Sequence, residues 1–342
     1  MRRTPRIDVS VAALLAALTL TGCAPTPAPP VSHEPTLQPR EDLPLPPGAV
    51  LDPAAGLPAT PFEPTKLDWE GSLRPTSAAP GEEEFTPTLD RIRERGRLIV
   101  GIDQSLYLLA FRDTATGELR GFEVDLAREI AHDIFADRLA QDPESDIIDF
   151  RFVDSADRSE LLRQGGVDVI IRTMSITPER ASQTAFSTPY LMSSVRLLTP
   201  GDRGVASMAD LAGRTVCIVD GTNLLQVART YAPDADILRT RTWSDCLMAT
   251  QQFQADAILA DDAILAGILA QDPYAQLLDG SVFTQYYGVG IRKGQDDLVR
   301  QVNATIERVR RDGTWRRLYS TWLAGSIAES APPPLMYRKE EQ

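Results

Sequence analysis

One stretch of the chain combines hydroxyl, amide and guanidinium donors at a spacing that suits binding of a small anion. Thr173, Ser175, Thr177 and Arg180 follow the apolar run at residues 167–171. Thr177 and the proline after it predict a helix start, because a hydroxyl caps free N–H groups and proline fits the first helical position. That helix end and the Arg180 guanidinium both favour a carboxylate. A capped helix with a purely structural arginine is the alternative.

A second donor-rich turn and two aspartates follow other short apolar runs. Thr222 and Asn223 lie in one such turn, and Asp261 and Asp103 each come directly after a predicted strand. Polar groups at the carboxyl ends of strands meet at the edge of an open α/β sheet where ligands bind. Carboxylates there suit an ammonium group. A tight connection and solvated loop aspartates are the alternatives.

Two further arginines stand at unusual or ambiguous places. Arg158 is predicted at the start of a helix, where a cation opposes the helix dipole, and this suggests a functional role. Arg172 ends the strand at residues 167–171, where an exposed, salt-bridged arginine would be ordinary.

Composition excludes several classes of function. The formal net charge is −13, which disfavours electrostatic binding to the phosphates of nucleic acid. The only histidines are His33 and His132, too few for a histidine-rich metal site. The chain has no phosphate-binding GxxxxGK[ST] loop, CxxC pair or GxSxG elbow. We therefore expect neither a cofactor nor a resident metal.

The elements that must position these residues alternate between strands and helices. Apolar runs predict buried strands, and apolar residues at helical spacing lie between most of them. This alternation predicts an α/β fold with mostly parallel strands over about residues 89–323. Periodicity leaves open whether that region is one domain or two lobes. The expected strands are residues 98–102, 167–171, 215–219, 257–259 and 288–291.

The first residues have the pattern of an export signal. Three arginines precede the apolar run Val11–Leu20, which is too short to span a bilayer as a helix. The run ends in Leu-Thr-Gly-Cys, similar to a bacterial lipobox. We expect residues 1–22 to be a lipoprotein signal peptide and Cys23 to carry the lipid at the outer face of the cell membrane. A plain secretory signal is the alternative.

The next segment is rich in proline. Residues 24–87 contain 16 of the 26 prolines, so we expect residues 23–87 to be the lipidated cysteine and a disordered linker. We expect the tail at residues 326–342 to be disordered as well.

Two cysteines remain once Cys23 is assigned to lipid. The remaining cysteines, Cys217 and Cys246, are even in number and lie in a chain that we expect to be exported, so we expect a disulfide bond between them. Closing that loop stabilises the fold by roughly 3.6 kcal/mol in the chain-entropy description. Two buried free thiols are the alternative.

The segment Gly121–Leu126, with apolar residues at helical spacing behind it, resembles the signature of the family 3 extracellular solute-binding proteins. These are the polar amino-acid receptors of ABC importers. The resemblance runs from about residue 89 to 323 and includes Phe186–Tyr190 and Asp312–Trp315. Within the family, the chain is most similar to the actinobacterial glutamine- and glutamate-binding lipoproteins of the GlnH group, which share the cysteine pair.

The resemblance implies a two-lobed, periplasmic-binding-protein-like fold of type II, with the ligand cleft between the lobes. Lobe 1 would comprise residues 88–190 and 288–325, and lobe 2 residues 191–287. The chain would cross between lobes near residues 189–194 and 283–287. By the same resemblance, the ligand-binding residues are Asp103, Arg158, Arg172, Thr173, Ser175, Arg180, Thr222, Asn223 and Asp261.

The resemblance also implies a role for each group. Arg180 matches the arginine that binds the α-carboxylate, and Ser175 and Thr173 match residues that help to hold the carboxylate and the ammonium. Thr222 and Asn223 match the contribution of the second lobe to binding the carboxylate. Asp261 matches the acidic partner of the ammonium, and Asp103 matches a first-strand aspartate that several members use.

Arg158 matches an arginine that binds the side-chain carboxylate in glutamate and aspartate receptors, and Arg172 stands near the ligand side chain. Two candidate cations favour an acidic ligand.

We therefore expect a monomeric, membrane-anchored, extracytoplasmic binding protein for glutamate or aspartate first and glutamine or asparagine second. It would deliver its ligand to an ABC importer and would not be an enzyme. Signalling to a membrane sensor is one alternative. A dehydratase-like enzyme on the same fold is the other, although such an enzyme has no need for an ammonium partner.

Overall fold

The computed structural model describes residues 43–54, 69–75, 85–201, 203–325, 327 and 331–340. The expected signal peptide and Cys23 lie outside these residues and stay predictions. Within the described ranges, no helix has both the length and the hydrophobicity to cross a bilayer.

The part that we call lobe 1 is built on a five-stranded sheet. In spatial order its strands are β6 (Ile148–Phe152), β2 (Leu98–Ile102), β7 (Val169–Ile170), β15 (Gly290–Arg292) and β8 (Thr184–Phe186). A small sheet joins β3 (Ser105–Leu106), β4 (Ala110–Arg112) and β5 (Leu119–Arg120). The helices are α1 (Pro87–Arg95), α2 (Phe122–Ile134), α3 (Ala136–Gln141), α4 (Arg158–Gln164), α5 (Pro178–Gln183), α9 (Asp296–Arg311) and α10 (Thr314–Trp322).

The part that we call lobe 2 is built on a seven-stranded sheet. Six strands lie in the order β1 (Val50–Asp52), β11 (Asp236–Thr240), β10 (Thr215–Val219), β12 (Ala257–Asp261), β9 (Leu191–Pro200) and β13 (Ala275–Leu277). Strand β14 (Phe283–Tyr287) also pairs with β9. The helices are α6 (Leu224–Tyr231), α7 (Trp243–Gln251) and α8 (Asp262–Leu269).

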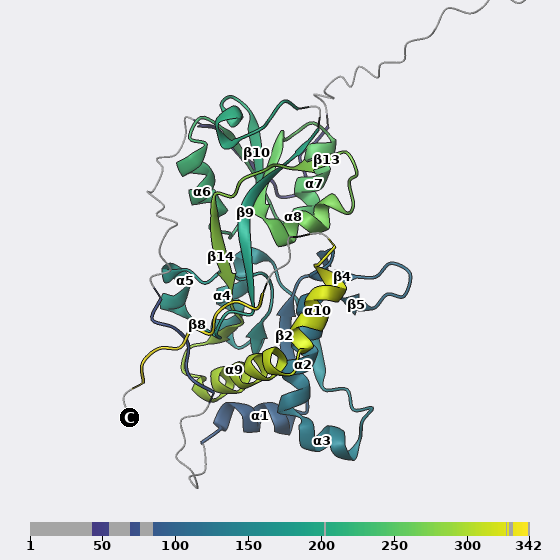
Figure 1. The fold of residues 1–342 in the computed structure, drawn as a ribbon, viewed down its shortest axis with the longest axis vertical. Coiled ribbons are helices and arrows are strands. Elements are labelled where there is room, and N and C mark those ends of the chain that lie inside the picture. Colours follow the sequence, from purple (N-terminus) through teal and green to yellow (C-terminus); the bar gives the residue numbers. More distant parts are fainter. Residues whose placement is uncertain are drawn as a thin grey trace, which may run out of the picture. The chain divides into compact units, whose positions relative to one another are not determined.

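Two adjacent strands carry the chain between the lobes. The chain leaves the sheet of lobe 1 after β8 and enters β9, and it returns from β14 into β15. Strands β9 and β14 are antiparallel neighbours, with Leu191 opposite Tyr287 and Val195 opposite Phe283 (Figure 1). The architecture thus has two lobes joined by two crossing strands, as the family resemblance implied.

Hydrophobic periodicity explains the main elements. In α9, Leu298, Val302, Ile306 and Val309 are buried on one face, and this helix packs against α1, α2 and α10 (Figure 1). In α2, buried apolar side chains repeat at helical spacing from Phe122 onward. Both patterns were visible in the sequence, because an amphipathic helix buries the stripe that repeats every three to four residues.

The strands are less uniformly parallel than predicted. Strand β2 is parallel to β6 and β7, and β10 is parallel to β11 and β12. The other pairs in the two main sheets are antiparallel. The expectation of a mostly parallel fold is therefore wrong, because strands at and beside the crossings return in the opposite direction.

Part of the expected linker is ordered on lobe 2. Residues Val50–Asp52 form β1, which pairs antiparallel with β11 at the edge of the sheet. The Asp52 carboxylate accepts a hydrogen bond from Arg239 Nε at 2.7 Å. A proline-rich composition disfavours a core of its own, but it does not prevent docking onto the edge of an existing sheet.

The expected tail and another part of the linker are ordered on lobe 1. Ser72 pairs with Tyr337 in a parallel bridge, and Arg300 forms an ion pair with Glu340 at 2.6 Å. The fully buried Asn303 donates to Ser72 Oγ at 2.7 Å and accepts from Thr188 N at 2.7 Å. The expectation of disorder over residues 23–87 and 326–342 is thus corrected for these segments.

Candidate ligand-binding site

Side chains from both lobes line one small cavity. Its volume is about 10 Å³, room for about one water molecule. A pocket of about 400 Å³ shares part of the lining and adjoins it. Seven of the nine predicted site residues line the small cavity, namely Arg158, Thr173, Ser175, Arg180, Thr222, Asn223 and Asp261. Asp103 and Arg172 do not line it. A ligand larger than a water molecule therefore enters this cavity only if the lobes separate.

The two lobes touch through a glycine of the second donor-rich turn. A Cβ atom on Gly221 would lie 2.4 Å from Ala156 Cα, and Gly221 has a φ of +71°. Both the close approach and this backbone conformation favour glycine. The Gly221 carbonyl accepts hydrogen bonds from Arg158 at 3.1 Å and from Arg180 at 3.2 Å, so both arginines contact the opposite lobe.

The predicted helix start holds Arg180. Thr177 caps α5 by accepting a hydrogen bond from the backbone N–H of Arg180, as the Thr-Pro pattern indicated. The guanidinium donates to the carbonyls of Ser175, at 2.9 Å, and Gly221. Burial lowers the pKa of Arg180, while the carboxylates of Glu179 and Asp261 act in the opposite direction. Carbonyl partners leave the charge available to an anion.

Arg158 is buried with neutral partners. Its side chain is 2% exposed and donates to the carbonyls of Ser155, Arg172, Thr173 and Gly221. No carboxylate among the described residues forms an ion pair with it. Burial, and then the nearby positive charges of Arg180 and Arg172, hold the pKa of Arg158 well below its usual range. A buried charge is costly without a counter-charge.

Arg172 is equally buried but has a counter-charge. Its guanidinium forms an ion pair with Asp103 and donates to Ser155 Oγ. Asp103 also accepts from the backbone N–H groups of Gln104 and Ser105, both at 2.7 Å. Of the two candidate cations, Arg172 is therefore ion-paired, as the alternative interpretation allowed, although it is buried and not exposed. Neither Arg172 nor Asp103 lines the cavity.

Asp261 lies at the end of β12 on the lobe 2 side of the cavity. It is 4% exposed and accepts a hydrogen bond from Gln285 Nε2 at 2.8 Å. Burial raises the pKa of Asp261 to about 6. The side chain of Gln285 in turn accepts from Asn223 Nδ2 at 2.9 Å. Sequence analysis did not identify Gln285, because its role depends on contacts with Asp261 and Asn223, which come from other elements.

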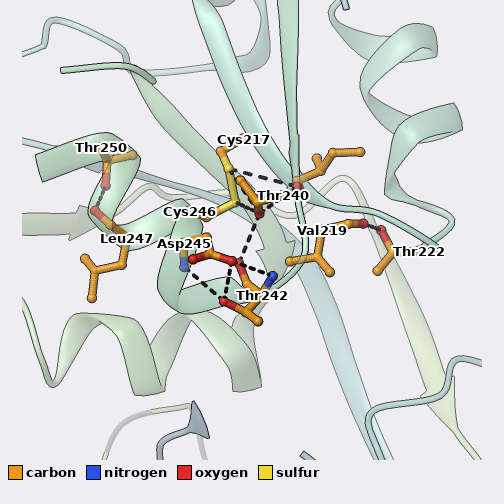
Figure 2. The surroundings of a disulfide bond; sticks show 10 residues. Cys217, Val219, Thr222, Thr240, Thr242, Asp245, Cys246, Leu247 and Thr250 are labelled. Atoms are coloured by element: carbon orange, nitrogen blue, oxygen red, sulfur yellow. Dashed lines mark hydrogen bonds between the residues drawn. A yellow bond between two sulfur atoms is a disulfide. The ribbon is translucent and has the colours of Figure 1, made fainter. Parts of the chain in front are cut away.

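The predicted disulfide supports the turn that carries Thr222 and Asn223. Cys217 of β10 and Cys246 of α7 are bonded, with Cα atoms 5.6 Å apart (Figure 2). Thr240 Oγ1 lies 3.2 Å from Cys246 Sγ and donates to the carbonyl of Thr242. At the end of β10, Thr222 Oγ1 donates to Val219 O at 2.6 Å. The disulfide therefore ties α7 to the strand that leads into this turn.

A buried glutamate lies behind the cavity. Glu123 accepts from the backbone N–H of Thr173 at 2.6 Å and from the Tyr190 hydroxyl. Thr173 has a φ of +41°, so this contact holds an uncommon backbone conformation. Burial raises the pKa of Glu123 to about 7. Sequence analysis used Glu123 only as part of a motif, although an acidic residue within a buried helical stripe was a usable signal.

The described part of the chain holds no group of three or more histidine, cysteine or acidic side chains placed for a metal ion. The cavity instead has guanidinium groups on one side and a carboxylate on the other. This arrangement suits a zwitterion, whose carboxylate and ammonium need opposite charges.

Comparison with known proteins gives a consistent result. Residues 98–325 match the bacterial extracellular solute-binding proteins, family 3. The chain is 30% identical over 250 residues to the ABC transporter glutamine-binding protein GlnH of Bacillus subtilis, which covers 72% of this chain and 89% of the relative. It is 31% identical over 255 residues to the glutamate-binding protein GluB of Corynebacterium glutamicum, covering 71% and 85%.

A solved structure of a binding protein has a similar fold. The P235GK mutant of ArgBP from T. maritima superimposes with a TM-score of 0.63 at 26% identity, covering 69% of this chain and 99% of that structure.

Proposed function

The chain belongs to family 3 of the bacterial extracellular solute-binding proteins, and from this premise we propose that it binds acidic amino acids. Glutamate or aspartate would be preferred over glutamine or asparagine. The family and the relatives above are binding proteins and not enzymes. The names of the relatives, for glutamine and for glutamate, support this class of ligand.

The observation that carries the preference is the buried charge of Arg158. Its hydrogen-bond partners are carbonyl oxygens, which satisfy its N–H groups without neutralising its charge. A ligand with a second carboxylate would supply the missing negative charge, whereas an amide would offer only another neutral oxygen. Arg180 remains for the α-carboxylate and Asp261 for the ammonium.

The binding step is a closure of the lobes. In the proposal, Arg180 and Ser175 hold the ligand from lobe 1, residues 88–190 and 288–325. Thr222, Asn223 and Asp261 hold it from lobe 2, residues 191–287. Because the ligand contacts both lobes only when they are together, it stabilises the closed state by those differential contacts.

The proposal places the protein at the outer face of the cell membrane. The signal at residues 1–22 would be removed and a lipid on Cys23 would tether the chain. The ligand would pass to an ABC importer, as the name of the Bacillus subtilis relative supports. Mass spectrometry of the membrane-extracted protein tests the lipid, and a non-acylated N-terminus would contradict it.

A thermal-shift screen across the twenty amino acids tests the ligand class. A ligand at 100 times its Kd stabilises the folded protein by about 2.7 kcal/mol, so the Tm should rise by roughly 5–10 °C with glutamate or aspartate. Arg180→Ala should abolish the shift. Arg163→Ala is the matched control, because Arg163 lies on α4 with its side chain 71% exposed. A shift with basic or apolar amino acids alone would contradict the proposal.

A further inference from the structure

Gln285 connects two residues that line the cavity. It lies on β14, one of the two strands that cross between the lobes, and is only 5% exposed. Its Nε2 donates to Asp261 Oδ1 at 2.8 Å, and its Oε1 accepts from Asn223 Nδ2 at 2.9 Å. The three side chains come from β12, β14 and the turn before α6.

The chemistry of the partners dictates the direction of this chain of hydrogen bonds. An ionised Asp261 can only accept, so Gln285 must turn its NH₂ group toward Asp261 and its oxygen toward Asn223. Asn223 must then donate to Gln285, and its own side-chain oxygen remains outside this contact. The lobe 2 side of the cavity therefore offers acceptors, which suit an ammonium group.

From this geometry we infer that Gln285 is a positioning residue, which fixes the ionised Asp261 carboxylate and the orientation of the Asn223 amide for an ammonium. The inference rests on the proposed function for its ligand, although the contacts themselves do not. Gln285 does not line the cavity, so it would affect ligand binding only through Asp261 and Asn223.

The electrostatic surroundings support a role for this contact. Asp261 is buried, and the carboxylate of Asp262 further disfavours its ionised form. Tyr287, then Gln285, then Arg180 act in the opposite direction. Removing the Gln285 donor therefore removes one of the few groups that favour the ionised carboxylate.

Carboxyl NMR titration of Asp261 in the ligand-free protein tests the inference directly. In Gln285→Leu the pKa of Asp261 should rise by about one unit, because a hydrogen bond to a charged group is lost. Gln276→Leu is the matched control, since Gln276 is exposed on β13 of the same sheet. An unchanged titration in Gln285→Leu overturns the inference.

A nearly isosteric variant extends the test to binding of L-glutamate. In Gln285→Glu two facing carboxylates would share a proton, so the pH below which binding weakens should move up by one unit or more. Gln276→Glu should leave that pH unchanged. If the titration shifts but no amino acid binds wild-type protein, the proposed function fails and the positioning role stands. If glutamate binds equally well to both Gln285 variants over the whole pH range, the positioning role fails.

Discussion

Two buried arginines of lobe 1 differ in one respect. Arg158 and Arg172 are each 2% exposed, and they lie close enough that Arg158 donates to the Arg172 carbonyl. Arg172 forms an ion pair with Asp103, whereas the hydrogen-bond partners of Arg158 are carbonyl oxygens and it has no ion pair among the described residues. Burial alone therefore does not mark a binding residue. The informative feature is a buried charge that the fold leaves uncompensated, because a ligand can then supply the counter-charge.

Two aspartates repeat this contrast with the opposite sign. Asp103 is surrounded by a guanidinium and backbone N–H donors. Asp261 accepts from the neutral amide of Gln285, and burial raises its pKa to about 6. The ion pair of Arg172 and Asp103 is thus part of the folded framework, whereas Arg158 and Asp261, which have no ion pair within the described part of the chain, line the cavity.

Breaking the compensated pair should have the largest effect. Asp103→Ala leaves the buried Arg172 without its counter-charge and should lower the free energy of unfolding by about 3–5 kcal/mol. Urea denaturation measures this change. Asp146→Ala is the control, because its ion pair with Arg97 is exposed and should contribute less than about 1 kcal/mol. Equal losses in the two variants would show that Arg172 is compensated by other groups.

The uncompensated aspartate should make binding pH-dependent. An ammonium needs ionised Asp261, whose pKa of about 6 in the folded protein lies above the ordinary 3.8. Affinity for glutamate should be constant at pH 7–8 and fall about tenfold as the pH decreases to 5. Calorimetry at these pH values measures it. Asp261→Asn should bind weakly with a flat profile over this range, and Asp279→Asn, at an exposed position, should retain the wild-type profile.

The uncompensated arginine should matter least for stability. Arg158→Met removes a buried charge that has no ionic partner. The free energy of unfolding of the ligand-free protein should therefore change by at most about 1 kcal/mol. Arg172→Met leaves Asp103 without its counter-charge, so it should change the free energy of unfolding by several times more. The same denaturation assay compares the two variants. A larger loss in Arg158→Met would mean that its carbonyl contacts are a main support of the fold.

The sequence was informative where one segment contains its own signal. The α9 stripe, the strand at residues 215–219, the Thr177 cap and the cysteine pair each depend on a local pattern, and all four are present. The pairing of Arg172 with Asp103 could not be read in this way, because the two lie 69 positions apart and meet only when β2 and β7 pair.

Contacts between distant segments also explain two other features that the sequence did not predict. Gln285 acquires its role from Asp261 and Asn223, which come from other elements. The proline-rich segments acquire order from surfaces that the rest of the fold provides, such as β11 and Asn303. Composition describes what a segment can do alone, and it does not describe which surface the segment meets.

The most direct test compares glutamate with glutamine, which differ in whether the side chain carries a charge. Calorimetry at pH 7.5 on wild type and Arg158→Met, with Arg163→Met as control, gives the ratio of the two affinities. Wild type and control should favour glutamate, and Arg158→Met should reduce that preference by roughly tenfold or more. An Arg158→Met protein that keeps the wild-type ratio would contradict the claim that the ligand compensates this buried guanidinium.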